Sequence, residues 1–319
     1  MLFGQVGFLQ YTGKLSLGSD PIRDYVRGEV SKSSVIPDGF YEFNGTDEFL
    51  SFTRVSGSTY VGFRVVHQVD MRPLMYQDYW RILNAEFYTF DGAQMNPLGV
   101  TALSGGESEC VFKRNSTKDD FTGGYHGDEL VTDFKFFADG IEVGMTAPIP
   151  LTPCSTSNYL EHSTMHATAE GGLPIEGHPV ECTHIKKTIF ARGGYETFNR
   201  LTWVAPGLVT LWYHGISCVG KQTALRGYTE ALFTPVEFTQ SGEQKLESVG
   251  SREFFSWGDD YSASVTAKQI LPAEDDAAST LFISDRNGDS KYYRRSPPKN
   301  VSQGEVWESV MKVAFKSRV

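Results

Sequence analysis

The chain has 319 residues, a formal net charge of -10, 40% hydrophobic residues and 21% charged residues. This composition is that of a globular protein large enough to bury a core, and it excludes a disordered or fibrous chain. The acidic balance, with no run of Lys or Arg longer than two, argues against nucleic acid as a partner. No stretch approaches the roughly 20 apolar residues of a membrane helix. Residues 1–18 lack the features of a signal peptide. We therefore expect neither membrane insertion nor a secretion signal.

Alternation of apolar and polar residues, the period of a β-strand, is the dominant pattern along the chain. Two hairpins are predicted, one at Asp139-Gly140 and one around Asn287-Gly288, because these pairs favour two-residue turns. Residues 24–30 fit a short helix or a turn, and residues 304–319 fit either a helix or a strand. In chain order the segments with strand character are 58–69, 78–90, 130–144, 180–191, 199–219, 230–240, 262–271 and 279–295.

Many short strands separated by glycine and proline predict an all-β fold, a β-sandwich or jelly-roll-like set of antiparallel sheets with few short helices. Strands do not alternate with long helices, which argues against a doubly wound α/β fold. We expect residues 1–100 to form an N-terminal β-rich section packed on a β-sandwich core, residues 101–319, that carries the site.

The four cysteines, Cys110, Cys154, Cys182 and Cys218, lie far apart and form no CxxC motif. Without a secretion signal, disulfides have little support. We predict four reduced, buried thiols.

Histidines are concentrated in one part of the chain, with five of the seven between residues 126 and 184. In the strand predicted at 180–191, His184 and Lys186 share one face, and Ile185 and Ile189 share the other. We expect the isoleucines to face the core and His184 to face solvent or a groove. His162 and His166 would share a face in either a strand or a helix.

The residue types needed for β-elimination on a uronic-acid polysaccharide are all present. Such a lyase needs a base, usually a histidine, and a tyrosine that donates a proton to the leaving glycosidic oxygen. It also needs a cation or amide that stabilises the developing charge. The predicted catalytic candidates are His126, His214, Tyr125, Tyr195, Tyr213, Arg192 and Asn199. The predicted substrate-binding candidates are Trp203, Trp212, Lys186 and Glu129.

Three other interpretations remain open. The segment GGYHGDE, residues 123–129, can be a plain tight turn in which His126 only bonds a neighbouring acid. A glycoside hydrolase would need two carboxyl groups flanking the scissile bond, which neither adjacent pair, Asp128 with Glu129 or Asp119 with Asp120, can supply alone. Partners could come from elsewhere in the chain, such as Glu107, Glu161 or Glu181. A metal site is a third option, but the available ligands match no compact zinc signature, so we expect no metal and no cofactor. Those ligands are His162, His166, His178, Cys182 and His184.

The segments DFTGGYHGDE and ARGGYETFNRLTW…VTLWYHGIS, within residues 105–240, resemble bacteriophage tail proteins that recognise or degrade surface polysaccharide. They are also similar to β-sandwich and jelly-roll polysaccharide lyases, which use a His/Tyr pair with an Arg or Asn. The resemblance implies a depolymerase that cleaves an acidic polysaccharide, located on a virion or an extracellular surface, and able to form a homo-oligomer. The alternatives are a noncatalytic glycan-binding or structural module of a phage tail, and a glycoside hydrolase.

Overall fold

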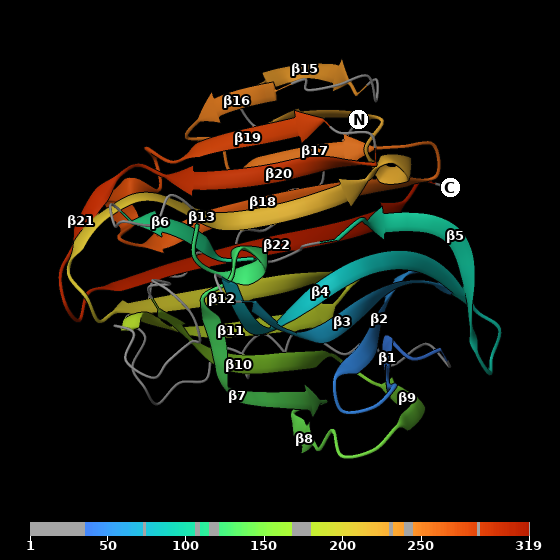
Figure 1. Cartoon of the computed structure of the whole chain (residues 1–319). Helices are drawn as coiled ribbons and strands as arrows, with labels where there is room; N and C mark the ends of the chain where they lie inside the picture. The colour runs from blue at the N-terminus through green and yellow to red at the C-terminus, as the bar shows by residue number, and fades with distance from the viewer. Residues whose placement is uncertain are drawn as a thin grey trace. The chain divides into compact units, whose positions relative to one another are not determined.

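The computed structural model describes residues 36–72, 75–105, 109–114, 121–167, 180–229, 232–238, 245–285 and 288–318 (Figure 1). Contacts divide the chain into Met1–Ser34 and Val35–Val319, and the described residues all belong to the second unit. Residues 24–30 therefore lie outside the described part. Whether residues 1–100 and 101–319 form separate domains stays a prediction.

The described residues form β-strands with three short 3-10 turns, which confirms the predicted all-β class. The turns are η1 (Gly124–His126), η2 (Lys221–Thr223) and η3 (Ala273–Asp275). The first strands are β1 (Gly39–Phe43), β2 (Glu48–Ser56), β3 (Thr59–Arg72), β4 (Met75–Phe90), β5 (Met95–Leu103), β6 (Val111–Arg114), β7 (Glu129–Ala138), β8 (Ile141–Val143), β9 (Ile149–Cys154), β10 (Asn158–Ala167) and β11 (Val180–Ala191). The remaining strands are β12 (Gly194–Trp203), β13 (Gly207–Gly220), β14 (Arg226–Thr229), β15 (Leu232–Glu237), β16 (Lys245–Val249), β17 (Glu253–Trp257), β18 (Tyr261–Leu271), β19 (Thr280–Asp285), β20 (Asp289–Ser296), β21 (Lys299–Val301) and β22 (Val306–Ser317).

The strands form two long hydrogen-bonded series. One runs in the order β8-β7-β10-β11-β12-β22-β18-β17-β14-β15. The other runs β9-β1-β2-β3-β4-β5-β13-β20-β19-β16, with β6 and β21 also paired to β13. These pairings are antiparallel, and a short parallel pairing of β4 with β7 links the two series.

The predicted turn chemistry is confirmed where the structure describes it. Asp139 and Gly140 both have positive φ, 49° and 80°, and join β7 to β8 as a two-residue hairpin. β19 pairs with β20 as predicted, although Asn287 lies outside the described residues. The ambiguous C-terminal segment is a strand, β22, because it pairs with both β12 and β18.

Aromatic side chains fill the space where strands of the two series meet. β13 contacts β18 and β22 across this space, and β2 contacts β11 and β22. Phe49, Phe63 and Phe190 are fully buried, and Phe63 packs against both Phe190 and Tyr195. Burying such a ring stabilises the fold by about 1.5–3 kcal/mol, so this cluster is the main apolar core.

The predicted orientation of β11 is wrong. His184 and Lys186 are buried, at 2% and 5% exposure, whereas Ile185 is 40% exposed and Ile189 is half-buried. Strand parity grouped these residues correctly, but it could not show that the polar face points inward. This polar face can be buried because neighbouring strands supply the hydrogen-bond partners that buried polar groups require.

A second polar group lies inside the fold around Arg294, which is 0% exposed. Its guanidinium donates to Asp276 Oδ1 at 2.5 Å and to the backbone oxygens of Ala267 and Ser251. His214 lies beside it, 3.3 Å from the Arg294 guanidinium. Burial, followed by the charge of Arg294, lowers the pKa of His214 to about 3. This imidazole is therefore neutral at physiological pH.

The four cysteines are free and buried, which confirms that prediction. In the described part of the chain, no helix is both long and apolar enough to cross a membrane.

Candidate functional site

The glycine-rich turn before β7 lies directly against neighbouring backbone and side chains. Gly123 has a φ of 101°, and a Cβ there would be 2.4 Å from the Cys110 carbonyl oxygen and 3.2 Å from His166 Cε1. A Cβ on Gly124, whose φ is 56°, would be 2.9 Å from the Glu109 side chain. Only glycine fits such close approach with positive φ. The turn thus places His126 on one side and covers a buried cluster on the other.

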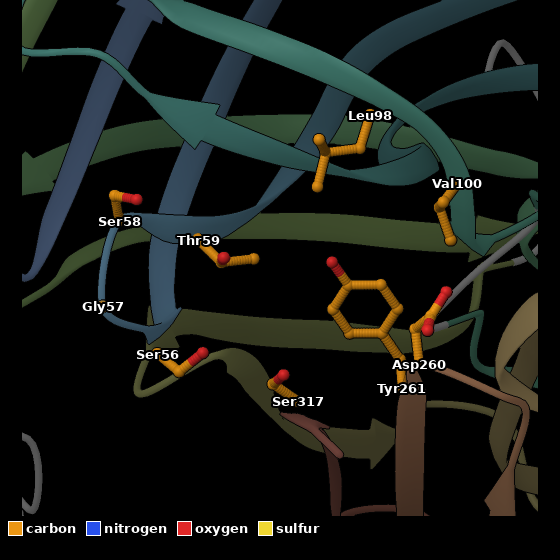
Figure 2. A pocket seen from close by; sticks show the side chains of 9 residues that line it. All are labelled: Ser56, Gly57, Ser58, Thr59, Leu98, Val100, Asp260, Tyr261 and Ser317. Carbon is orange, nitrogen blue, oxygen red and sulfur yellow. The ribbon is translucent and has the colours of Figure 1, made fainter. Parts of the chain in front are cut away.

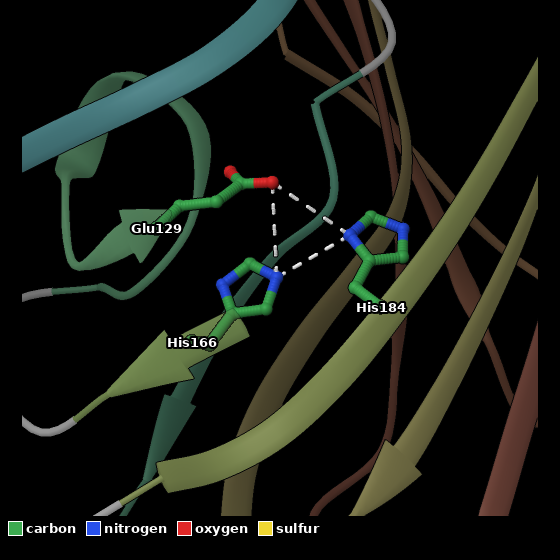
Figure 3. Close-up of side chains that lie close together, drawn as sticks. All are labelled: Glu129, His166 and His184. Atoms are coloured by element: carbon green, nitrogen blue, oxygen red, sulfur yellow. Dashed lines mark hydrogen bonds and ion pairs between the residues drawn. The ribbon is translucent and has the colours of Figure 1, made fainter. Parts of the chain in front are cut away.

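The buried cluster behind the turn consists of Glu129, His166 and His184 (Figure 3). Glu129 opens β7 and lies opposite His166 on β10, and β11 brings His184 beside them through its pairing with β10. His166 Nε2 lies 3.3 Å from His184 Nδ1, and these two atoms lie 3.9 and 3.8 Å from Glu129 Oε1. The tertiary fold therefore directs two imidazoles and a carboxylate at one point.

Hydrogen bonds fix the members of this cluster. Gly124 N donates to Glu129 Oε2 at 2.7 Å, and the Thr164 hydroxyl donates to Glu129 Oε1 at 2.9 Å. Burial alone would raise the pKa of Glu129, but the neighbouring His166 and His184 and the Gly124 N–H lower it overall. Burial lowers the pKa of His166 to about 4. At neutral pH the cluster therefore holds a carboxylate beside a neutral His166.

A partly exposed group of rings lies on the other side of the turn. Phe121 is 5.2 Å from the His126 ring and 5.7 Å from the Tyr213 ring, between ring centroids. Tyr213 is in turn 5.4 Å from Tyr293. All four rings are half-buried, so part of each remains open to solvent. We call these four residues the ring patch.

Three cationic side chains border the ring patch. Lys113 Nζ lies 6.0 Å from the Phe121 ring centre, and Lys291 Nζ lies 4.8 Å from that of Tyr293. Arg295 lies opposite Tyr213 in the register of β13 with β20, and its charge opposes the rise that burial causes in the pKa of that phenol. This concentration of positive charge stands out on a chain whose net charge is -10.

The predicted site residues divide between the surface and the interior. His126 and Tyr213 reach the ring patch, and Tyr125 lies in η1 between Gly124 and His126. Arg192 occupies the turn between β11 and β12, with a φ of 53°. The buried residues of the predicted site are His214, Tyr195, Asn199, Trp203, Trp212, Lys186 and Glu129.

Those interior residues contact other buried side chains. Trp203 and Trp212 pack against Trp307 in a second apolar cluster, and Trp212 Nε1 lies 3.2 Å from Cys110 Sγ. Asn199 bonds His184 rather than any surface group. Their predicted roles in catalysis or stacking stay predictions, and these side chains are buried in the structure.

Sequence reasoning missed Phe121, Tyr293, Lys291 and Arg295. The segment YYRRS, residues 292–296, was available as a signal, since it reads as a solvated strand end with adjacent rings and cations. Alternation along the strand divides this segment between two faces. Tyr292 and Arg294 are buried, whereas Tyr293 and Arg295 are half-exposed.

A separate surface hollow lies at the β2–β3 turn, beside β5 and the start of β18 (Figure 2). Burial, with a smaller contribution from Asp260, raises the pKa of Tyr261 at its edge. The lining otherwise consists of hydroxyls and small apolar groups, and it includes none of the predicted site residues. The lining residues are Ser56, Gly57, Ser58, Thr59, Leu98, Val100, Asp260, Tyr261 and Ser317.

Comparison with known proteins gives no family. No protein-family model matches the sequence, and no curated protein matches it. Among solved structures, the chain is similar to carbohydrate-active enzymes, all at low identity.

Three of these structures illustrate the similarity. A heparinase III has a TM-score of 0.39 and 10% identity, covering 90% of this chain and 37% of its own. A variant of a glycoside hydrolase family 97 enzyme from Pseudoalteromonas sp. strain K8 has a TM-score of 0.38 and 6% identity, covering 81% and 34%. The 4-alpha-glucanotransferase from Thermococcus litoralis has a TM-score of 0.34 and 10% identity, covering 88% and 40%.

The chain therefore spans about two fifths or less of the length of each of these enzymes. At these identities and TM-scores, the similarity assigns the chain neither a family nor an activity. None of the three is described as a phage protein.

Proposed function

We propose that the ring patch, with Lys113, Lys291 and Arg295 at its border, binds an acidic polysaccharide. The observation that carries the proposal is the meeting of partly exposed rings and cations from β6, η1, β13 and β20 on an otherwise acidic chain. Flat rings offer stacking surfaces for the apolar faces of sugar rings, and the cations offer partners for uronate carboxylates. The part of the chain that the structure describes places no comparable set around the hollow of Figure 2.

The proposal predicts that Tyr293→Ala weakens binding about tenfold, at the low end of the roughly 1–3 kcal/mol that one stacking ring contributes where nucleobases stack on aromatic side chains. Arg295→Ala should weaken binding similarly and reduce its dependence on salt. Affinity electrophoresis through polygalacturonate, alginate and hyaluronan measures both effects, with neutral dextran as the reference polymer.

Phe255→Ala is the matched control, since Phe255 is also a half-buried strand ring but packs against Trp257 on β17. It should bind like the wild type. Failure of all three acidic polymers to retard the wild-type protein, or equal retardation of Tyr293→Ala, contradicts the proposal.

A polysaccharide lyase is the second candidate, favoured by the contacts that His126 and Tyr213 both make with the Phe121 ring. Burial raises the pKa of Tyr213, against the opposing effect of Arg295, so the phenol keeps its proton at neutral pH. A protonated phenol can donate to a leaving glycosidic oxygen while an imidazole removes the C5 proton. In this candidate Arg295, rather than Arg192 or Asn199, neutralises the carboxylate.

Elimination creates a conjugated double bond, so a lyase would raise ultraviolet absorbance during incubation with the acidic polymers. His126→Ala should then lower the rate at least 100-fold, the usual range for losing a general base, without changing the unfolding midpoint. New reducing ends without absorbance would indicate a glycoside hydrolase, and binding without either signal would leave a noncatalytic module.

The hydrolase has less structural support. Glu129 and Glu181 are buried, and Glu161 pairs with Lys187 at 2.8 Å. Asp119 and Asp120 lie outside the described residues. A place on a phage tail or an extracellular surface, and assembly as a homo-oligomer, stay predictions.

A further inference from the structure

We propose that Glu129, His166 and His184 form a binding site for one divalent transition-metal ion, with Zn²⁺ as the representative ion (Figure 3). The three side chains come from β7, β10 and β11, and all are buried. Two imidazoles and one carboxylate are a donor set that transition metals bind. This site is distinct from the ring patch and lies on the other side of the glycine-rich turn.

The separations among the donor atoms suit a metal ion, and the two imidazoles also share a hydrogen bond at 3.3 Å. The three distances, 3.3, 3.8 and 3.9 Å, leave the carboxylate too far from either imidazole nitrogen for a hydrogen bond. The point equidistant from the three atoms in their common plane lies about 2.1 Å from each, which is the usual length of Zn–N and Zn–O bonds. The geometry is therefore close to that of three ligands around one ion.

Hydrogen bonds also orient the donors. Asn199 Nδ2 donates to Ser309 Oγ, which leaves Asn199 Oδ1 to accept a hydrogen bond from His184 Nε2 at 3.1 Å. His184 Nδ1 then carries its lone pair toward Glu129 and His166. Such an outer hydrogen bond is characteristic of metal-binding histidines. The hydrogen bonds that Gly124 and Thr164 donate to Glu129 fix the carboxylate in the same way.

Charge supports the same assignment. A buried carboxylate is costly unless it is paired, and on β10 and β11 Glu129 faces two imidazoles as well as the Thr164 hydroxyl. Lys186 lies two residues from His184 on the same buried face. Its ammonium group is the cation of the protein that could neutralise Glu129 in place of a metal ion. If Lys186 alone balances Glu129, the cluster needs no ion, and the experiment below distinguishes the two cases.

Metal binding would link β7, β10 and β11, and through Glu129 it would also hold the turn that contains His126. Gly124 bonds Glu129 directly, and Gly123 lies against the His166 ring. An ion held by Glu129 and His166 would therefore stabilise the turn and, through it, the position of His126 at the ring patch.

The test uses the full chain, stripped with a chelator and dialysed, and then titrated with Zn²⁺ and, separately, Co²⁺. We expect one ion per chain by native mass spectrometry, an increase in the unfolding midpoint on adding Zn²⁺, and visible absorption bands of Co²⁺ bound to nitrogen and oxygen. Glu129→Gln and His184→Asn should each weaken Zn²⁺ binding at least 100-fold.

His162→Asn is the matched control, because His162 is a buried histidine on the same face of β10 outside the cluster. It should retain wild-type affinity. If a ligand variant fails to fold, the Co²⁺ spectrum of the wild type still decides. No 1:1 binding by the wild type, or unchanged affinity in a folded ligand variant, overturns the proposal whether or not the ring patch binds glycan.

Discussion

Asp276→Asn is expected to lower the free energy of unfolding by about 3–5 kcal/mol, the usual cost of removing one partner from a buried ion pair. Arg294 is 0% exposed, and its guanidinium donates to both Asp276 Oδ1 and the Asp276 carbonyl oxygen. Asp276 also accepts from Arg252 Nε at 2.7 Å and from Gln269 N at 2.8 Å. The substitution keeps the shape of the side chain but leaves a buried guanidinium without its counter-charge.

Chemical denaturation monitored by tryptophan fluorescence measures this loss. Glu274→Gln serves as the control, because Glu274 is 73% exposed and its ion pair with Lys299 lies in solvent. Exposed pairs contribute little, so the control should unfold at nearly the wild-type denaturant concentration. Equal stability of Asp276→Asn and wild type would show that the Arg294 charge is stabilised by its other partners.

Gly123→Ala is expected to cost about 3 kcal/mol or more of stability. Gly123 has φ 101° and ψ 149°, a conformation that is essentially restricted to glycine. The added methyl would also lie 2.4 Å from the Cys110 carbonyl oxygen, so the turn must move. Movement of the turn would break the hydrogen bond from Gly124 N to Glu129.

Gly140→Ala separates the two causes, because Gly140 has φ 80° but nothing within 4 Å of its added Cβ. Its cost should be about 1–2 kcal/mol, from the left-handed backbone alone. Thermal unfolding of both variants gives the comparison. If the two variants lose equal stability, then close packing at Gly123 adds nothing, and the turn is less tightly held than its contacts imply.

Local sequence patterns were sufficient to predict many of the strands and one hairpin. Alternation along β11 and β13 and the Asp139-Gly140 turn identified strands and a hairpin, because each depends on residues adjacent in the chain. The same reasoning could not orient β11. His184 and Lys186 are polar, yet their side of the strand is buried, because Glu129 on β7 and Asn199 on β12 lie beside it and provide polar partners.

The sequence by itself determined an acidic, all-β chain with reduced cysteines, two-residue turns, and the residue types that acidic-sugar chemistry needs. Tertiary structure alone decided which of those residues meet. It brought His126 and Tyr213 to Phe121, and it buried His214 beside Arg294. The reason is that the alternation of a strand depends on neighbouring residues, whereas the pairing of distant strands depends on how whole sheets pack.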